Sequence, residues 1–295
     1  MSSLRGKVVL ITGAARGIGA GTARALVKKG CKVVITDLDA APLHELAAEL
    51  GADNAVAQVC DVCDLAAMEL AVQAGIERFG GIDLVLANAG IASYGSVLAV
   101  DPATFKRVLD INVVGVFHTV RAALPSVIER KGYILVVSSL AAFAPAPGLA
   151  AYNASKAGVE HFANALRLEV AYRGVDVGTA HMSWIDTPLV QDAKNDLGSF
   201  NDMLAALPGP LGKTTSVQAC VDAFVEGLAK RKRRVYVPGW VGIIAKLRAV
   251  MVSKVGDRET MKQAPTLMPK MDAEVAALGR STSSRNTALN SDLAR

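Results

Sequence analysis

The chain of 295 residues is long enough to bury a large core, and with 52% hydrophobic and 20% charged residues it is too apolar for a disordered protein. Its net charge of +5 comes largely from the run KRKRR at 230–234 and from the last quarter of the chain, without interleaved aromatic residues, so we expect no nucleic-acid partner. The first apolar run is too short for a signal peptide, and no later run reaches the roughly 20 residues of a membrane span, so we expect a cytoplasmic protein.

Short β-branched runs alternate with longer helical patterns along most of the chain. The predicted strands are 7–12, 32–36, 55–59, 83–88, 133–138, 175–180 and 234–237, and the predicted helices are 17–29, 42–50, 64–79, 103–130 and 152–172. This alternation is typical of parallel strands joined by right-handed crossovers. We therefore predict an α/β fold with a doubly wound, Rossmann-like, mostly parallel sheet covered by helices on both faces.

A glycine-rich stretch, TGAARGIG at 12–19, stands between the first predicted strand and its helix. Gly13, Gly17 and Gly19 allow a sharp turn and a close ligand approach, and the helix N-terminus offers free N–H groups to a diphosphate. The alternative is a tight strand–helix turn without a ligand. Because strand and helix both flank the glycines, we predict a dinucleotide site.

The second strand ends at Asp37, about 20 residues after the last glycine, where a carboxylate can bind the adenosine ribose hydroxyls. The same charge repels a 2′-phosphate and favours NAD, whereas the guanidinium of Arg16 would favour NADP. Asp37 could instead be a surface carboxylate at a strand end. We predict NAD as the cofactor, with NADP as the alternative.

Four cysteines include a pair in CDVC at 60–63, which has the spacing of a metal or redox pair. No second pair and no histidine lies nearby in the sequence, so we interpret these cysteines as free thiols and predict no metal site.

Tyr152 and Lys156 stand four residues apart in the predicted helix AAYNASKAGVEHFANALRLEV at 150–170, and so project from one side of it. They could form an exposed pair, with Ser139 as a strand cap. Alternatively, they form an acid–base pair, in which the ammonium lowers the pKa of the phenol from about 10.

Six motifs in chain order decide between these alternatives: TGAARGIG at 12–19, CDV at 60–62, ANAG at 87–90, Asn112 in DINVVG, Ser139 thirteen residues before Tyr152, and YNASK at 152–156. Together they resemble the short-chain dehydrogenase/reductase family. The resemblance implies a seven-stranded sheet, a nicotinamide cofactor and interconversion of alcohols and carbonyl compounds.

The resemblance also assigns cofactor contacts. Arg16 and Ile18 belong to the glycine turn, Asp61 and Val62 would contact the adenine, and Thr187 with the backbone of Ile185 would bind the nicotinamide carboxamide. The small-residue motif that would line the adenosine ribose comprises Asn88, Ala89 and Gly90.

The implied catalytic residues are Tyr152, Lys156, Ser139 and Asn112. Tyr152 would act as general acid and base, and Lys156 would lower the tyrosine pKa and bind the nicotinamide ribose. Ser139 would hold the substrate oxygen, while Asn112 would kink the long helix and hold a water molecule that links the lysine to solvent.

The sequence departs from the family after the sixth strand, where Met182 and Ser183 replace the usual Pro-Gly. Trp184 follows at once. Together with Phe143, Leu149 and apolar residues of 189–207 it predicts a pocket for a bulky apolar substrate, although each of these residues could equally be core.

Two regions interrupt the alternation. We expect a catalytic domain over 1–238 with a mobile flap at 189–214, and an extension over 239–295 that is helical and then a weakly structured polar tail. The basic and apolar stretch 239–255 could contact a membrane surface or pack within an oligomer. We expect a homodimer or homotetramer, because the helices at 103–130 and 152–172 resemble the family's dimer-forming pair.

These features predict an oxidoreductase that transfers a hydride between a nicotinamide cofactor and a hydrophobic secondary alcohol or ketone, with Tyr152 as general acid and base. The first alternative is an NADPH-dependent 3-oxoacyl-thioester reductase. A non-catalytic dinucleotide-binding protein ranks last, because Ser139, Tyr152 and Lys156 are all present.

Overall fold

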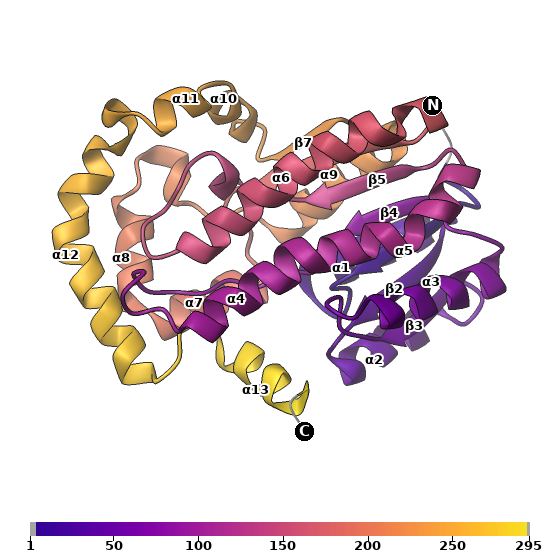
Figure 1. Cartoon of the computed structure of the whole chain (residues 1–295), viewed down its shortest axis with the longest axis horizontal. Helices are drawn as coiled ribbons and strands as arrows, with labels where there is room; N and C mark the ends of the chain where they lie inside the picture. Colours follow the sequence, from indigo (N-terminus) through magenta and orange to yellow (C-terminus); the bar gives the residue numbers. More distant parts are fainter. Residues whose placement is uncertain (1–3, 294–295) are drawn as a thin grey trace.

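The computed structural model describes residues 4–293, which fold around one parallel seven-stranded sheet (Figure 1). The strands lie in the order β3-β2-β1-β4-β5-β6-β7, which confirms the predicted fold class. Their bounds are β1 Val8–Thr12, β2 Lys32–Asp37, β3 Ala55–Val59, β4 Leu84–Ala87, β5 Tyr133–Val137, β6 Asp176–Met182 and β7 Arg234–Val237.

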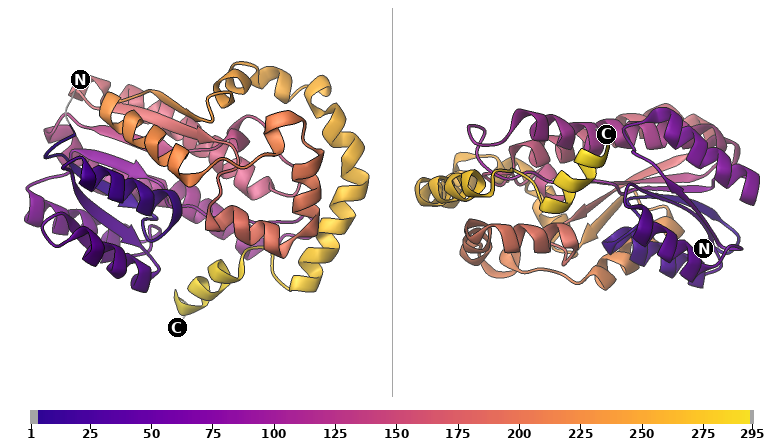
Figure 2. Two further views of the ribbon diagram at one scale, coloured as in Figure 1. Left: turned by 180° about the vertical axis from the view of Figure 1, so that it is seen from behind. Right: turned by 90° about the horizontal axis from the view of Figure 1, so that it is seen from below.

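Helices cover both faces of this sheet (Figure 2). One layer contains α1 (Gly17–Lys28), α2 (Ala40–Leu50) and α9 (Val217–Lys230), and the other contains α3 (Leu65–Phe79), α5 (Gly115–Glu129) and α6 (Ala150–Val170). Neighbouring residues of a strand point to opposite faces of the sheet. Ile11 therefore belongs to the hydrophobic core under α1, α2 and α9, and Leu10 belongs to the core under α3, α5 and α6. Burial on both faces explains why the central strands read as continuous apolar runs.

The long helix predicted at 103–130 has a break in its middle. It consists of α4 (Pro102–Leu109), a π-helical segment at Asp110–Val114 and then α5. Polar residues interrupt the apolar stretches of this segment. Taken as a whole, Pro102–Glu129 nevertheless has the length and composition of a membrane span. Half of its most apolar window is buried inside the fold.

The predicted flap at 189–214 forms α7 (Pro188–Asp196), α8 (Gly198–Ala206) and a 3-10 turn at Gly209–Gly212. The extension forms α10 (Val241–Lys246), α11 (Arg248–Met251), α12 (Lys254–Leu278) and α13 (Ser284–Leu293). In Figure 1, α12 runs beside α8, and Phe200 and Leu267 share a third hydrophobic cluster there.

The prediction of a weakly structured tail over 281–295 is wrong for its described part. Ser281, Thr282 and Ser283 are buried, and α13 follows them. The backbone N–H of Tyr94 donates to the Ser281 carbonyl at 2.8 Å, and the Thr282 hydroxyl donates to the Ala92 carbonyl at 2.9 Å. Small polar residues can therefore be buried here, because the neighbouring loop satisfies them. Residues 1–3 and 294–295 lie outside the described range.

Candidate active site

The glycine turn after β1 is packed too tightly for side chains. Gly13 has a φ of +65°, and a Cβ atom there would lie 2.8 Å from the Ala89 Cα. A Cβ at Gly19 would lie 2.2 Å from the Gly13 carbonyl oxygen. The amide nitrogen of Asn88 donates to the carbonyls of Thr12 and Gly13, both at 3.0 Å, and so holds the turn in place. The ANAG segment thus supports the turn from the neighbouring strand β4.

A cavity of about 280 Å³ opens above this turn. Arg16, Gly17 and Ile18 line it at the start of α1, which has no side-chain cap and no acidic residue in its first turn. The first N–H groups of the helix are therefore available to an anionic ligand. This is the arrangement that a dinucleotide diphosphate requires.

Asp37 lines the same cavity at the end of β2. Its carboxylate accepts the Ala15 backbone N–H at 2.9 Å and the Asp39 N–H at 3.1 Å, and burial raises its pKa. Arg16 forms an ion pair of 2.6 Å with Asp39. The guanidinium that would recognise a 2′-phosphate is thus already paired with a carboxylate.

The residues expected around the adenine lie next to Asp37. Asp61 and Val62 line the cavity, as do Asn88, Ala89 and Gly90. Asp61 also pairs with Arg107 of α4 at 2.7 Å, a contact that spacing along the sequence could not reveal. Cys60 and Cys63 are free thiols with pKa values raised by burial to about 11 and about 12.

Tyr152 and Lys156 lie at the other end of the cavity, on the first turns of α6. The Lys156 Nζ atom lies 5.5 Å from the centroid of the Tyr152 ring and donates to the Val137 carbonyl at 3.0 Å. Ser139 is a hydrogen-bond partner of the Tyr152 hydroxyl. Lys156 is 4% exposed, Ser139 is buried and Tyr152 is half-buried, so these residues do not form the exposed pair that the sequence left open.

The electrostatics differ from the expectation that Lys156 lowers the tyrosine pKa. Burial raises the pKa of Tyr152, and the hydrogen bond with Ser139 opposes this only in part. The same burial lowers the pKa of Lys156 to about 8. The cause is the low dielectric of the site, which disfavours the charged form of either group.

Asn112 lies in the π-helical segment between α4 and α5. Its amide nitrogen donates to the Ile91 carbonyl and to the Ser155 hydroxyl, both at 2.9 Å, and its oxygen accepts the Ile91 N–H at 2.9 Å. A Cβ at Gly90 would lie 3.1 Å from this oxygen and 3.3 Å from the Lys156 Nζ. A small residue at position 90 is therefore needed where Asn112 and Lys156 meet.

Sequence reasoning missed two serines that support this cluster. The Ser155 hydroxyl, besides accepting from Asn112, donates to the Tyr152 carbonyl at 2.8 Å. The Ser138 hydroxyl donates to the Lys156 carbonyl at 2.9 Å. Both are fully buried, and their position beside residues already singled out was the only available signal.

A second, mainly apolar cavity of about 130 Å³ adjoins the first. Leu149 and Trp184 line it together with Ser139 and Tyr152, and the Trp184 ring packs edge-on against Phe200 at 5.3 Å. Thr187 and Ile185 also border it, and Thr187 reaches the larger cavity as well.

Phe143 does not line this cavity, contrary to expectation. Its ring packs behind the site, 5.3 Å from the His181 ring and 5.5 Å from the Arg248 guanidinium. His181 is buried, and its two ring nitrogens contact the Thr179 hydroxyl and the Ser139 carbonyl. His181 therefore supports the backbone that carries Ser139, and Phe143 packs against His181.

The Met182-Ser183 replacement lies where β6 ends. The Ser183 N–H donates to the Val237 carbonyl at 2.9 Å, so this residue continues the alignment with β7. The Met182 carbonyl accepts the Ser139 hydroxyl at 3.4 Å. Met182 lines both cavities, so the turn after β6 lies where the two cavities meet.

A doubly wound parallel sheet, a glycine turn and a Ser-Tyr-Lys cluster beside the cavity define a dinucleotide-binding oxidoreductase. The short chain dehydrogenase family matches residues 7–198, and the chain belongs to that family. No group of three side chains suited to hold a metal ion occurs in the described part of the chain.

Three similar proteins have names that describe an activity or a bound ligand. An uncharacterized oxidoreductase of Mycobacterium tuberculosis is 31% identical over 271 residues, which are 82% of this chain and 98% of that protein. A trans-4-hydroxycyclohexanecarboxylate dehydrogenase of Sinomonas cyclohexanicum is 33% identical over 73% of this chain and 83% of its own length. The crystal structure of 3-ketoacyl-(acyl-carrier-protein) reductase from Brucella melitensis, complexed with NADH, has a TM-score of 0.71 and 32% identity over 80% of this chain and 98% of that one.

Proposed function

We propose that this protein is an NAD-dependent dehydrogenase that interconverts a hydrophobic secondary alcohol and its ketone. The observation that carries the proposal is the position of Tyr152, which lines both the larger cavity above the glycine turn and the smaller cavity beside it. A proton-transfer group at that junction reaches a substrate in one cavity and a cofactor in the other.

When bound in the larger cavity, a nicotinamide would supply or accept the hydride. The Ser139 hydroxyl holds the substrate oxygen beside Tyr152, and the phenol gives its proton to that oxygen as a ketone is reduced. Burial keeps the Tyr152 hydroxyl protonated at neutral pH, which suits this direction. In alcohol oxidation the same oxygen takes up the proton, assisted by the neighbouring Lys156 ammonium.

The choice of NAD rests on two carboxylates. Asp37 stands where the adenosine ribose hydroxyls would lie, and Asp39 forms an ion pair with Arg16. Both disfavour a 2′-phosphate. The NADH in the similar reductase from Brucella melitensis supports the same choice.

The substrate class rests on the smaller cavity. A volume of about 130 Å³ between Leu149, Trp184 and Phe200 suits a ring or a short branched chain. The similarity to a dehydrogenase named for a hydroxycyclohexane substrate supports a cyclic secondary alcohol.

An NADPH-dependent 3-oxoacyl-thioester reductase is the second candidate, favoured by the likeness to the 3-ketoacyl reductase. One experiment separates the candidates: absorbance of the reduced nicotinamide with cyclic secondary alcohols, their ketones and a 3-oxoacyl thioester, each with NAD(H) and NADP(H). We expect turnover of cyclic alcohols with NAD. Turnover of the thioester with NADPH alone would favour the second candidate, and cofactor binding without any turnover would favour a non-catalytic protein.

For the assembly we propose a homodimer or homotetramer formed through α5 and α6. Phe117 of α5, Leu168 of α6 and Tyr172 in the turn after α6 are large apolar residues that are 45%, 69% and 77% exposed. Sedimentation analysis tests the proposal, and a monomer would contradict it.

Membrane contact through 239–255 and a cytoplasmic location stay predictions. Ile243, Leu247 and Val250 are exposed beside Lys246, a pattern that suits an anionic surface. Flotation of the full chain with anionic vesicles tests the contact, and cell fractionation tests the location.

A further inference from the structure

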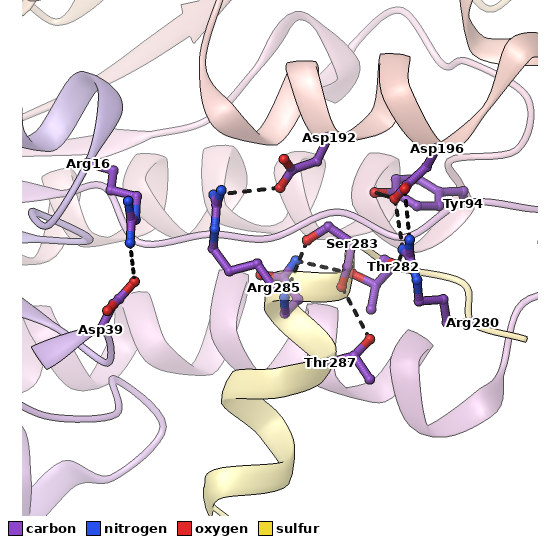
Figure 3. A network of polar contacts seen from close by, with 11 residues as sticks. Arg16, Asp39, Tyr94, Asp192, Asp196, Arg280, Thr282, Ser283, Arg285 and Thr287 are labelled. Carbon is purple, nitrogen blue, oxygen red and sulfur yellow. Dashed lines mark hydrogen bonds and ion pairs between the residues drawn. The ribbon is translucent and has the colours of Figure 1, made fainter. Parts of the chain in front are cut away.

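The C-terminal segment reaches the cavity of the glycine turn, although nearly 270 residues separate them in the sequence. Ser283, Arg285, Asn286 and Leu289 line this cavity together with Arg16 and Asp37. In Figure 3 the Arg285 side chain extends from α13 toward Asp192 of α7, and the Arg16–Asp39 pair lies across from it. A residue of the tail is therefore placed at the mouth of the proposed cofactor site.

The segment before α13 is anchored independently of Arg285. Arg280 forms two hydrogen bonds of 2.7 Å with the Asp196 carboxylate, one from each terminal nitrogen. Ser281 accepts the Tyr94 N–H, and Thr282 donates to the Ala92 carbonyl (Figure 3 draws several of these residues). Because these contacts fix the start of α13, Arg285 is not needed to hold the tail in place.

The charges around the cavity set Arg285 apart. Three lining residues are basic, namely Arg16, Lys156 and Arg285, whereas Asp37, Asp39, Asp61 and Asp192 are acidic. Arg16 is bound at 2.6 Å to Asp39, and Lys156 is buried beside Tyr152. Arg285 is separated from Asp192 by 3.6 Å, which is longer than a hydrogen bond, and its side chain is 39% exposed. A pair this open is weak and readily exchanges its partner.

We propose that Arg285 binds the diphosphate of the dinucleotide, so that α13 closes the cofactor cleft over the glycine turn. The proposal rests on the proposed function, because it requires a dinucleotide in the larger cavity. A guanidinium matches phosphate oxygens through paired hydrogen bonds, and here it adds a cation opposite the free N–H groups of α1. Asp192, 3.6 Å from the guanidinium, is the carboxylate that the diphosphate would displace.

Calorimetric titration of Arg285→Ala tests this contact with three probes: NADH, ADP and adenosine. The matched control is Arg258→Ala, which removes an exposed arginine of α12 away from the cavity. We expect Arg285→Ala to weaken NADH and ADP binding about tenfold, as for loss of one charge-assisted contact, and to leave adenosine binding within about twofold. Unchanged NADH and ADP affinities, or an equal loss for adenosine, would overturn the proposal.

The variant Asp192→Asn tells whether Arg285 binds the ligand or only pairs with Asp192 to hold the tail in place. If Arg285 binds the diphosphate, removal of the competing carboxylate leaves NADH affinity unchanged or raises it. If the two residues only fasten the tail, Asp192→Asn and Arg285→Ala weaken NADH binding equally, and the proposal fails. Hydrogen exchange of residues 284–289 adds a second readout, since NADH should slow it in the wild type and less in Arg285→Ala. Absence of NADH binding by the wild type would instead reject the proposed function.

Discussion

The Lys156 Nζ atom lies 5.5 Å from the centre of the Tyr152 ring, one helical turn along α6, and Lys156 is buried whereas Tyr152 is half-buried. Each group would be more stable uncharged there, because the surroundings are apolar. At pH 7 the phenol is thus protonated, and Lys156 is still an ammonium although its pKa is lowered to about 8. Proton transfer and protein stability are coupled through these two residues.

Replacement of Tyr152 by Phe should remove catalysis and keep cofactor binding. The ring still fills its place on α6, but the hydroxyl that bonds to Ser139 is lost. We expect kcat to fall about a thousandfold, in the middle of the range for loss of a general acid, and the NADH dissociation constant to change less than about twofold. Steady-state kinetics and NADH titration measure both. Turnover within a factor of three of wild type would remove Tyr152 from the mechanism.

Replacement of Lys156 by Met should stabilise the fold in a pH-dependent way. The folded-state pKa of Lys156 is about 8 and the ordinary value is 10.5, so folding below pH 8 requires burial of an ammonium. This cost is complete below pH 8 and disappears as the pH rises to 10.5. After allowance for the lost hydrogen bond to Val137, we expect Lys156→Met to be more stable at pH 7 by about 2 kcal/mol.

Urea unfolding of both proteins at pH 7 and pH 10 measures this difference. Lys156→Gln is the control, because it also removes the charge and retains a donor for the Val137 carbonyl. The difference in unfolding free energy between Lys156→Met and the wild type should be smaller at pH 10 than at pH 7. A variant less stable than wild type at pH 7 would show that the ammonium stabilises the folded state.

The strands and the glycine turn could be predicted because each is a local pattern. The run at 7–12 is apolar for the length of β1, and Gly13 follows it where a turn requires a positive φ. Asp37 was likewise placed by its distance from the glycines. Such signals lie within a few turns of chain and do not depend on tertiary packing.

Contacts between distant segments could not be predicted in this way. The spacing of Phe143 and Trp184 gave no means to tell which one faces the cavity, because both are large and apolar next to functional residues. The pairing of Arg107 with Asp61 and the burial of Ser281–Ser283 depend on how loops meet. Polar composition alone predicted weak structure for a tail in which the loop after β4 satisfies the hydroxyl groups of Ser281 and Thr282.

Replacement of Asp37 by Ser should relax the preference for NAD. The serine keeps a hydroxyl near Ala15 but removes the charge that repels a 2′-phosphate. We expect NADH to bind about tenfold more weakly and NADPH more tightly than in wild type. The control Asp39→Ser releases Arg16 and retains the ribose-binding carboxylate, so NADH affinity should hold while NADPH affinity rises. Fluorescence titrations with both cofactors measure this, and an unchanged preference in Asp37→Ser would make Asp37 a structural strand end.

Trp184 and Phe143 offer a matched test of the substrate cavity. Trp184→Ala should enlarge the cavity of about 130 Å³ and raise the ratio of kcat/KM for a bicyclic over a monocyclic secondary alcohol about tenfold. Phe143→Ala should leave this ratio unchanged, because the ring packs against His181 and Arg248 outside the cavity. It should instead lower the free energy of unfolding by about 3 kcal/mol, since Phe143 is 3% exposed. The reverse pattern, with substrate preference altered by Phe143→Ala alone, would place the substrate on the other side of Ser139.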